Sequence, residues 1–111
     1  MANITRYGDY ITAGDLSANI IGSAVDVSSA DRLSFQCNWT GTSPVSAIKL
    51  QCSNDGSNWH DISGATVSVS GNTGAGMVQS VSVAFRYVRM FSTFTSGTGT
   101  LVAKFNIIDD Q

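Results

Sequence analysis

The chain has 111 residues, of which 42% are hydrophobic and only 13% are charged, and its formal net charge is −2. This length allows one domain with one core, and the six scattered Lys and Arg residues exclude the basic patch typical of nucleic-acid binding. No window of about 18 apolar residues occurs, so the sequence predicts no membrane span. With so little charge, Ser, Thr, Asn and Gly must supply the polar surface, which suits a chain that packs against copies of itself or a larger assembly.

Apolar and polar residues alternate with a period of two along most of the chain, as in strands that bury one face. The predicted strands cover residues 20–27, 33–39, 48–52, 67–69, 81–85, 87–94 and 101–107. The first is less regular than the others because Gly22 interrupts it, and residues 28–32 have room for one turn. Helical periodicity is not sustained anywhere, so the sequence predicts an all-β fold.

Four clusters rich in Gly, Asn, Asp and Ser separate these strands, at residues 41–44, 54–58, 71–76 and 96–99. Gly tolerates positive φ, and Asn and Asp bond to their own backbone, so each cluster is predicted to reverse the chain. Seven to eight short strands separated by turns predict an antiparallel β-sandwich that occupies residues 1–111 as a single domain. The two cysteines lie too close in sequence for the immunoglobulin pattern, which favours a jelly-roll-like or looser sandwich.

Residues 1–18 are less periodic than the rest of the chain and include Tyr7 and Tyr10. They fit equally well an edge strand followed by a loop and an arm that docks on a neighbouring subunit. Aromatic side chains are common anchors of protein interfaces. Tyr7, Tyr10 and Phe94 are therefore the candidate residues for an interface between subunits.

Residues 53–59, Ser-Asn-Asp-Gly-Ser-Asn-Trp, carry the strongest local signal in the sequence. Asp-Gly is a favoured pair at hairpin turns, and turn chemistry accounts for every residue here. This favours a structural hairpin in which Trp59 folds back onto the core. The alternative is a site that contacts a sugar, with Asn54, Asp55, Asn58 and Trp59 as its candidate residues. The segment is one residue short of the sialidase-type Asp-box, which is itself mainly a structural hairpin.

Few residue types suited to catalysis are present. The chain has no Glu and a single histidine, His60, whose neighbour Asp61 is predicted to point to the opposite face of a strand. The chain therefore offers few residues that could act in general acid–base catalysis. One His and two Cys at this spacing do not fit a zinc site. The sequence thus predicts a protein that is not an enzyme and that has no metal site and no cofactor.

Other polar groups are predicted to have structural roles. Cys37 and Cys52 fall on predicted inward faces of consecutive strands, and free thiols that fill the core are favoured over a disulfide. Asp109 and Asp110 end the chain and are predicted to form a solvated tail. The N-terminus lacks the apolar core of a signal peptide, which indicates either a cytosolic product or a mature form whose signal has been removed, and the initiating Met1 favours the first.

Two stretches resemble a known group of proteins. Residues 48–62, IKLQCSNDGSNWHDI, and the run FRYVRM at residues 85–90 are similar to segments of small β-sandwich proteins of tailed bacteriophage virions. That group includes capsid decoration proteins and tail or fibre components. A comparable pair of segments occurs in discoidin-like carbohydrate-binding modules, which are longer than this chain. The resemblance extends over residues 33–107, most of the chain.

The resemblance implies a capsid decoration or cement protein that stabilises a phage shell by assembly. Its partners would be the major capsid protein or other virion proteins, in a virion assembled in the host cytoplasm, with no nucleic acid or membrane as partner. Decoration proteins are commonly trimers at symmetry points of the shell, so a homotrimer with a symmetric interface is expected. A carbohydrate-binding or host-adhesion module of the tail or fibre is the alternative, and a major capsid or tail-tube role also fits.

Overall fold

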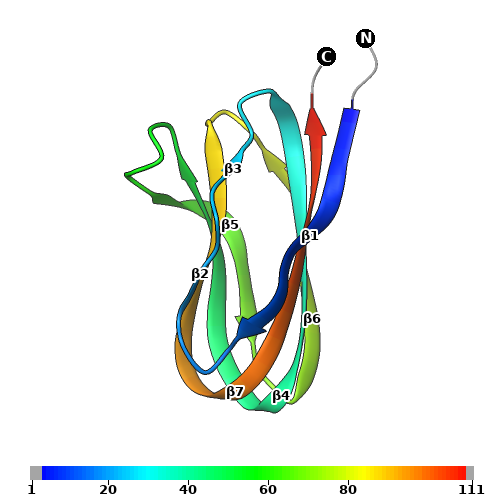
Figure 1. The fold of residues 1–111 in the computed structure, drawn as a ribbon, viewed down its shortest axis with the longest axis vertical. Helices are drawn as coiled ribbons and strands as arrows, with labels where there is room; N and C mark the ends of the chain where they lie inside the picture. Colours follow the sequence, from blue (N-terminus) through cyan, green and yellow to red (C-terminus); the bar gives the residue numbers. More distant parts are fainter. Residues whose placement is uncertain (1–3, 110–111) are drawn as a thin grey trace.

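The computed structural model describes residues 4–109, which form seven β-strands and no helix (Figure 1). The strands are β1 (Ile4–Asp15), β2 (Ile20–Ile21), β3 (Val25–Asp26), β4 (Ala30–Ser53), β5 (His60–Val69), β6 (Thr73–Ser82) and β7 (Tyr87–Asp109). All pairings between them are antiparallel. The described part of the chain thus has no helix of the length and apolarity needed to cross a membrane.

The two longest strands, β4 and β7, have 24 and 23 residues and pair with each other along almost their whole length. The pairing runs from Ala30 opposite Asp109 to Ser53 opposite Tyr87. Both strands curve back together at one end of the molecule, as Figure 1 shows. The bend carries one continuous strand pair from one side of the core to the other.

The bend divides the sheet into two layers. Layer one contains, in order, β1, residues 100–109 of β7, residues 30–42 of β4, and β6. Layer two contains, in order, β2 and β3, residues 87–96 of β7, residues 45–53 of β4, and β5. Apolar side chains of both layers fill the space between them. This arrangement confirms the predicted all-β antiparallel sandwich.

The clusters at 41–44 and 96–99 reverse the direction of the chain, as predicted, but each does so as a bend within one long strand and not as a turn between two strands (Figure 1). The backbones of β4 and β7 approach each other closely here. A Cβ on Gly41 would collide with the carbonyl oxygen of Thr98 on the facing strand. Gly97 has a φ of 80°, in the left-handed region that favours glycine. The glycines therefore let two paired backbones turn together without breaking their ladder.

The strand β6 begins within residues 71–76, which the sequence predicted as a turn. Two glycines of this strand face large side chains of the core. A Cβ on Gly74 would collide with the ring of Trp39, and a Cβ on Gly76 would collide with Val67 of β5. The glycines are therefore present because Trp39 and Val67 fill their space, and not because the chain turns.

The core contains aromatic and aliphatic side chains from every long strand. Phe35 on β4 and Phe105 on β7 pack with ring centroids 5.1 Å apart, and Tyr10 on β1 packs edge-on against Phe105 at 4.7 Å. Burial of apolar surface stabilises the fold by about 25 cal/mol per Å². The buried apolar residues are Leu16, Val27, Leu33, Phe35, Cys37, Trp39, Ile48, Leu50, Ala65, Val67, Val69, Val81, Val88, Met90, Leu101, Ala103, Phe105 and Ile107.

An ion pair joins the two ends of the described chain. Arg6 on β1 donates from Nε and Nη2 to the two carboxylate oxygens of Asp109 on β7, at 2.6 and 2.9 Å. The hydroxyl of Ser29 also donates to Asp109, which is only 6% exposed. The prediction of a solvated tail was therefore wrong for Asp109, because β1 pairs with β7 and brings Arg6 to it. Asp110 lies outside the described residues.

Asp109→Asn is expected to destabilise the fold by about 1–2 kcal/mol at neutral pH. The hydrogen bond from Arg6 holds the pKa of the Asp109 carboxyl below its ordinary value. A depressed folded pKa means that the stabilisation is complete above about pH 4 and is lost as the pH falls through the folded pKa. Urea unfolding at pH 7 and near pH 2 measures both effects. Asp9→Asn is the control, because the pair of Asp9 with Lys104 is exposed and 3.6 Å long.

Equal losses for the two variants at pH 7, or a loss for Asp109→Asn that persists unchanged at low pH, would contradict this role of the ion pair.

Candidate functional site

The segment 53–59 joins β4 to β5 in a loop that its own side chains hold in place. The Asp55 carboxylate accepts hydrogen bonds from the backbone N–H groups of Ser57 and Asn58, each at 2.8 Å. It also accepts one from the Asn58 amide at 2.8 Å. The Ser53 hydroxyl oxygen accepts the N–H of Gly56 at 2.8 Å, and Gly56 has a φ of 79°. Hydrogen bonds between residues of the loop therefore fix its conformation.

The polar residues proposed for ligand contact are engaged by this loop. Hydrogen bonds from the backbone and side chain of Asn58 hold the pKa of Asp55 far below its usual range, so Asp55 is ionised at neutral pH. The Asn54 side-chain oxygen accepts the backbone N–H of Arg86 at 3.2 Å, which ties the loop to the start of β7. Asn54, Asp55 and Asn58 thus form hydrogen bonds within the chain.

Trp59 is half-buried and lies under Arg89, so the prediction that it folds back onto the core was wrong. The guanidinium carbon of Arg89 is 4.3 Å from the centre of the Trp59 ring. Val88 and Met90, on either side of Arg89 in β7, are fully buried. Side chains alternate along a strand, so Arg89 points outward from layer two and holds the Trp59 ring there.

A chain of hydrogen bonds extends from Arg89 across the outer face of layer two. Arg89 Nε donates to Gln51 Oε1 at 2.9 Å, and the Gln51 amide donates to Asp61 Oδ1 at 2.9 Å. Lys49 Nζ donates to the other Asp61 oxygen at 3.2 Å. Lys49, Gln51, Trp59, Asp61, Arg89 and Phe91 are referred to below as the Arg89 cluster. Sequence reasoning found Trp59 but missed Arg89 and Gln51, whose outward positions follow from strand alternation.

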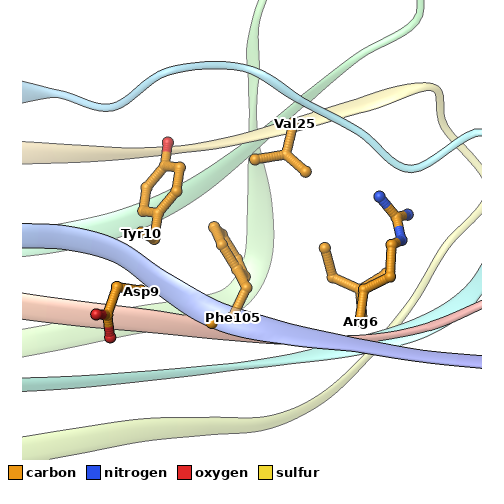
Figure 2. A pocket seen from close by; sticks show the side chains of 7 residues that line it. Arg6, Asp9, Tyr10, Val25 and Phe105 are labelled. Atoms are coloured by element: carbon orange, nitrogen blue, oxygen red, sulfur yellow. The ribbon is translucent and has the colours of Figure 1, made fainter.

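A shallow cleft of about 240 Å³ lies at the open edge of the sandwich, between β1 and β3. In Figure 2, Arg6 and Tyr10 on β1 and Phe105 on β7 point toward the segment that carries Val25, while Asp9 points away from it. The Tyr10 hydroxyl donates to the carbonyl of Ser23 at 2.5 Å and accepts the N–H of Met90 at 3.2 Å. Tyr10 therefore ties layer one to layer two.

The predicted strand at residues 20–27 is divided into β2 and β3 beside this tyrosine. A Cβ on Gly22 would collide with the Tyr10 hydroxyl. Gly22 interrupts the strand because the tyrosine takes its space.

The structure does not bring the three proposed interface residues together. Tyr10 lies in layer one, and Phe94 lies in layer two near the bend. Phe94 is 37% exposed, and its N–H donates to the Asn19 side-chain oxygen at 2.7 Å. The backbone of Tyr7 pairs opposite Asn106, but its side chain lies outside the described part of the structure.

Cys37 and His60 lie in different layers, whereas Cys52 on β4 pairs directly opposite His60 on β5. Cys37 is buried in layer one, and its thiol donates a weak hydrogen bond to the carbonyl of Gly76 at 3.7 Å. His60 is exposed at the start of β5 in layer two. Cys52 is half-buried, and both cysteines are free. Among residues 4–109, no three His, Cys or acidic side chains gather in a way that would hold a metal ion.

Alkylation with iodoacetamide at neutral pH is expected to modify Cys52 much faster than Cys37. Burial raises the pKa of the Cys37 thiol to about 11, and the thiolate is the reactive form. Mass spectrometry of the Cys52→Ser and Cys37→Ser variants separates the two rates. Equal labelling in the native state would contradict the burial of Cys37, whereas equal labelling in urea is the expected control.

The comparisons with known proteins find likeness in fold. No protein-family model matches the chain, and no curated protein matches its sequence. Among solved structures, the chain is similar to the SPBc2 prophage-derived protein YomS, with a TM-score of 0.65 and 14% identity over 98% of this chain and 96% of that chain. It is also similar to a chain of infectious bursal disease virus, Gx strain, with a TM-score of 0.56 and 6% identity. That match covers 97% of this chain and 31% of the viral chain.

Proposed function

We propose that this chain is a structural protein of a bacteriophage virion, where it acts as a capsid decoration or cement protein. The observation that carries the proposal is the similarity of fold to a prophage-derived protein over 98% of this chain and 96% of that one. The similarity to a chain of a virus structure supports the same class. The proposal assigns no catalytic activity to the chain.

The strand order supports this proposal. When β4 and β7 are each counted as one strand in each layer, the orders of the two layers are those of a jelly roll. The jelly roll is common in viral capsid and lectin domains. A sequence with few charged residues also suits a protein whose role is to pack against other subunits.

We propose the major capsid protein as the partner and a homotrimer as the bound form. The test of location is the composition of particles purified after induction of the phage genome that encodes the chain. The chain is expected in a fixed stoichiometric ratio to the major capsid protein. Particles that lack the chain are expected to form but to release DNA at a lower temperature. Absence of the chain from purified particles would contradict the proposal.

The proposed trimer is tested separately by size exclusion with light scattering at several concentrations. Phe94 is one of the few large apolar side chains that the described surface exposes. Phe94→Asp is therefore expected to lower the mass of the assembly, whereas Met77→Asp, on the outer face of layer one, is not. A monomer at every concentration would contradict a trimer in solution. Only binding to the shell could then bring three subunits together.

A carbohydrate-binding or host-adhesion role is the second candidate. The observation that favours it is the half-exposed Trp59 ring beside Arg89 on the outer face of layer two. Glycan arrays with the wild type, Trp59→Ala and the control Met77→Ala test it. Saturable binding that only Trp59→Ala removes would favour this candidate over decoration.

A further inference from the structure

The two outer faces of the sandwich differ in the side chains that they present. On layer one, the central strand β4 presents Ser34, Gln36 and Asn38. On layer two, the outward side chains include Arg89 and Phe91, with the Trp59 ring beside them. Trp, Phe and Arg are enriched at the centres of protein interfaces. Layer two therefore carries an aromatic and guanidinium surface of the kind found at the centres of protein interfaces.

Two neighbouring rungs of layer two organise this surface. In the first rung, Gln51 lies opposite Asp61 on one side and opposite Arg89 on the other. In the second, Phe91 lies opposite Lys49 and opposite Ile21, which is 62% exposed. Side chains at such positions are neighbours on one face of the sheet. The first rung is polar, and the second adds an apolar border to it.

The guanidinium of Arg89 is held in one orientation. It lies 4.3 Å from the Trp59 ring centre and 5.9 Å from that of Phe91, and its Nε bonds to Gln51. Gln51 is in turn fixed by Asp61. Within residues 4–109, the two terminal amino groups of Arg89 have no acceptor, so they remain as oriented donors.

The charges of the cluster leave Arg89 uncompensated. Asp61 accepts from Lys49 at 3.2 Å and neutralises it, while it reaches Arg89 only through the Gln51 amide. A planar guanidinium with two unused amino groups matches a carboxylate, which it binds through two parallel hydrogen bonds. The apolar border of Ile21 and Phe91 would exclude water from such a pair and strengthen it.

We infer that the Arg89 cluster is the centre of the docking surface of this protein and that it receives an acidic side chain, Asp or Glu, from a partner protein. The inference rests on the proposed virion function and names the chemistry of the partner. It places the docking surface on the outer face of layer two, away from Phe94 at the bend.

The test is a titration of the ¹⁵N-labelled protein with the peptide acetyl-Glu-Glu-Glu-amide, followed by NMR. Saturable shifts are expected at the Trp59 indole N–H and the Arg89 Nε–H, while the buried Trp39 indole serves as internal reference. The uncharged peptide acetyl-Gln-Gln-Gln-amide should produce no such shifts. Arg89→Lys keeps the charge but loses the paired hydrogen bonds, so affinity should fall about ten-fold. Arg32→Lys, an exposed arginine of layer one, is the matched control and should bind as the wild type does.

Each other outcome overturns the inference. Equal shifts with the two peptides would exclude carboxylate recognition, and an unchanged affinity in Arg89→Lys would exclude Arg89 as its centre. Tighter binding of N-acetylneuraminic acid than of the Glu peptide would assign the site to an acidic glycan. The composition of purified particles tests the virion function separately. The chain can be present in particles without binding the peptide, and it can bind the peptide while it is absent from particles.

Discussion

Replacing Gly97 with alanine is expected to destabilise the fold by about 3 kcal/mol or more, a large part of the stability of a small domain. Gly97 has a φ of 80°, which costs an L-residue about 1–2 kcal/mol. In addition, the new Cβ would collide with the backbone carbonyl of Ser43 in the facing strand. No side-chain rotation can relieve a clash with backbone, so the bend between the layers must open.

Two other glycines separate these effects. Gly64 has a φ of 78°, but the position that a Cβ would occupy is open. Gly64→Ala should therefore destabilise the fold only through backbone strain, by about 1–2 kcal/mol. Gly8 has ordinary backbone angles and empty space, so Gly8→Ala should be neutral or slightly stabilising. Urea unfolding followed by far-UV circular dichroism ranks the three variants. If Gly97→Ala loses no more than Gly64→Ala, the close approach at the bend is not present in solution.

The bend also explains why part of the fold could be predicted from sequence and part could not. Alternation in residues 33–39 and 101–107 correctly indicated strands with one buried face. The same glycine-rich composition at 41–44 and 96–99 serves either a tight turn between two strands or a bend within one strand. What decides between them is the pairing of β4 with β7, which joins residues far apart in the chain. Local turn chemistry carries no information on such pairing.

The candidate site was only partly predictable for the same reason. Trp59 and the Asp55 loop are local features, and their residues are contiguous in sequence. The Arg89 cluster draws Asp61 from β5, Gln51 from β4 and Arg89 from β7, and only the registers between these strands bring them into one rung. Similarly, Asp109 could not be identified as buried without knowing that β1 covers it.

Truncation of Phe35 to alanine is expected to cost about 3–5 kcal/mol, the range for a buried phenylalanine. Phe35 is 1% exposed and packs at 5.1 Å and 54° against Phe105, which in turn contacts Tyr10 at the open edge. The variant leaves a cavity in the core between the layers and removes the ring that packs against Phe105. Close packing of the interior allows only partial collapse into that cavity.

Phe35→Leu and Phe94→Ala are the controls for this prediction. The leucine fills much of the cavity, so Phe35→Leu should destabilise the fold less than Phe35→Ala does. Phe94 is 37% exposed, so Phe94→Ala should destabilise the fold by about 1 kcal/mol or less. Unfolding in urea, followed by circular dichroism, measures all three. A loss for Phe35→Ala no larger than that for Phe94→Ala would mean that the two layers do not close over a common core. The docking surface depends on this closure, because the buried Val88 and Met90 anchor the strand that presents Arg89.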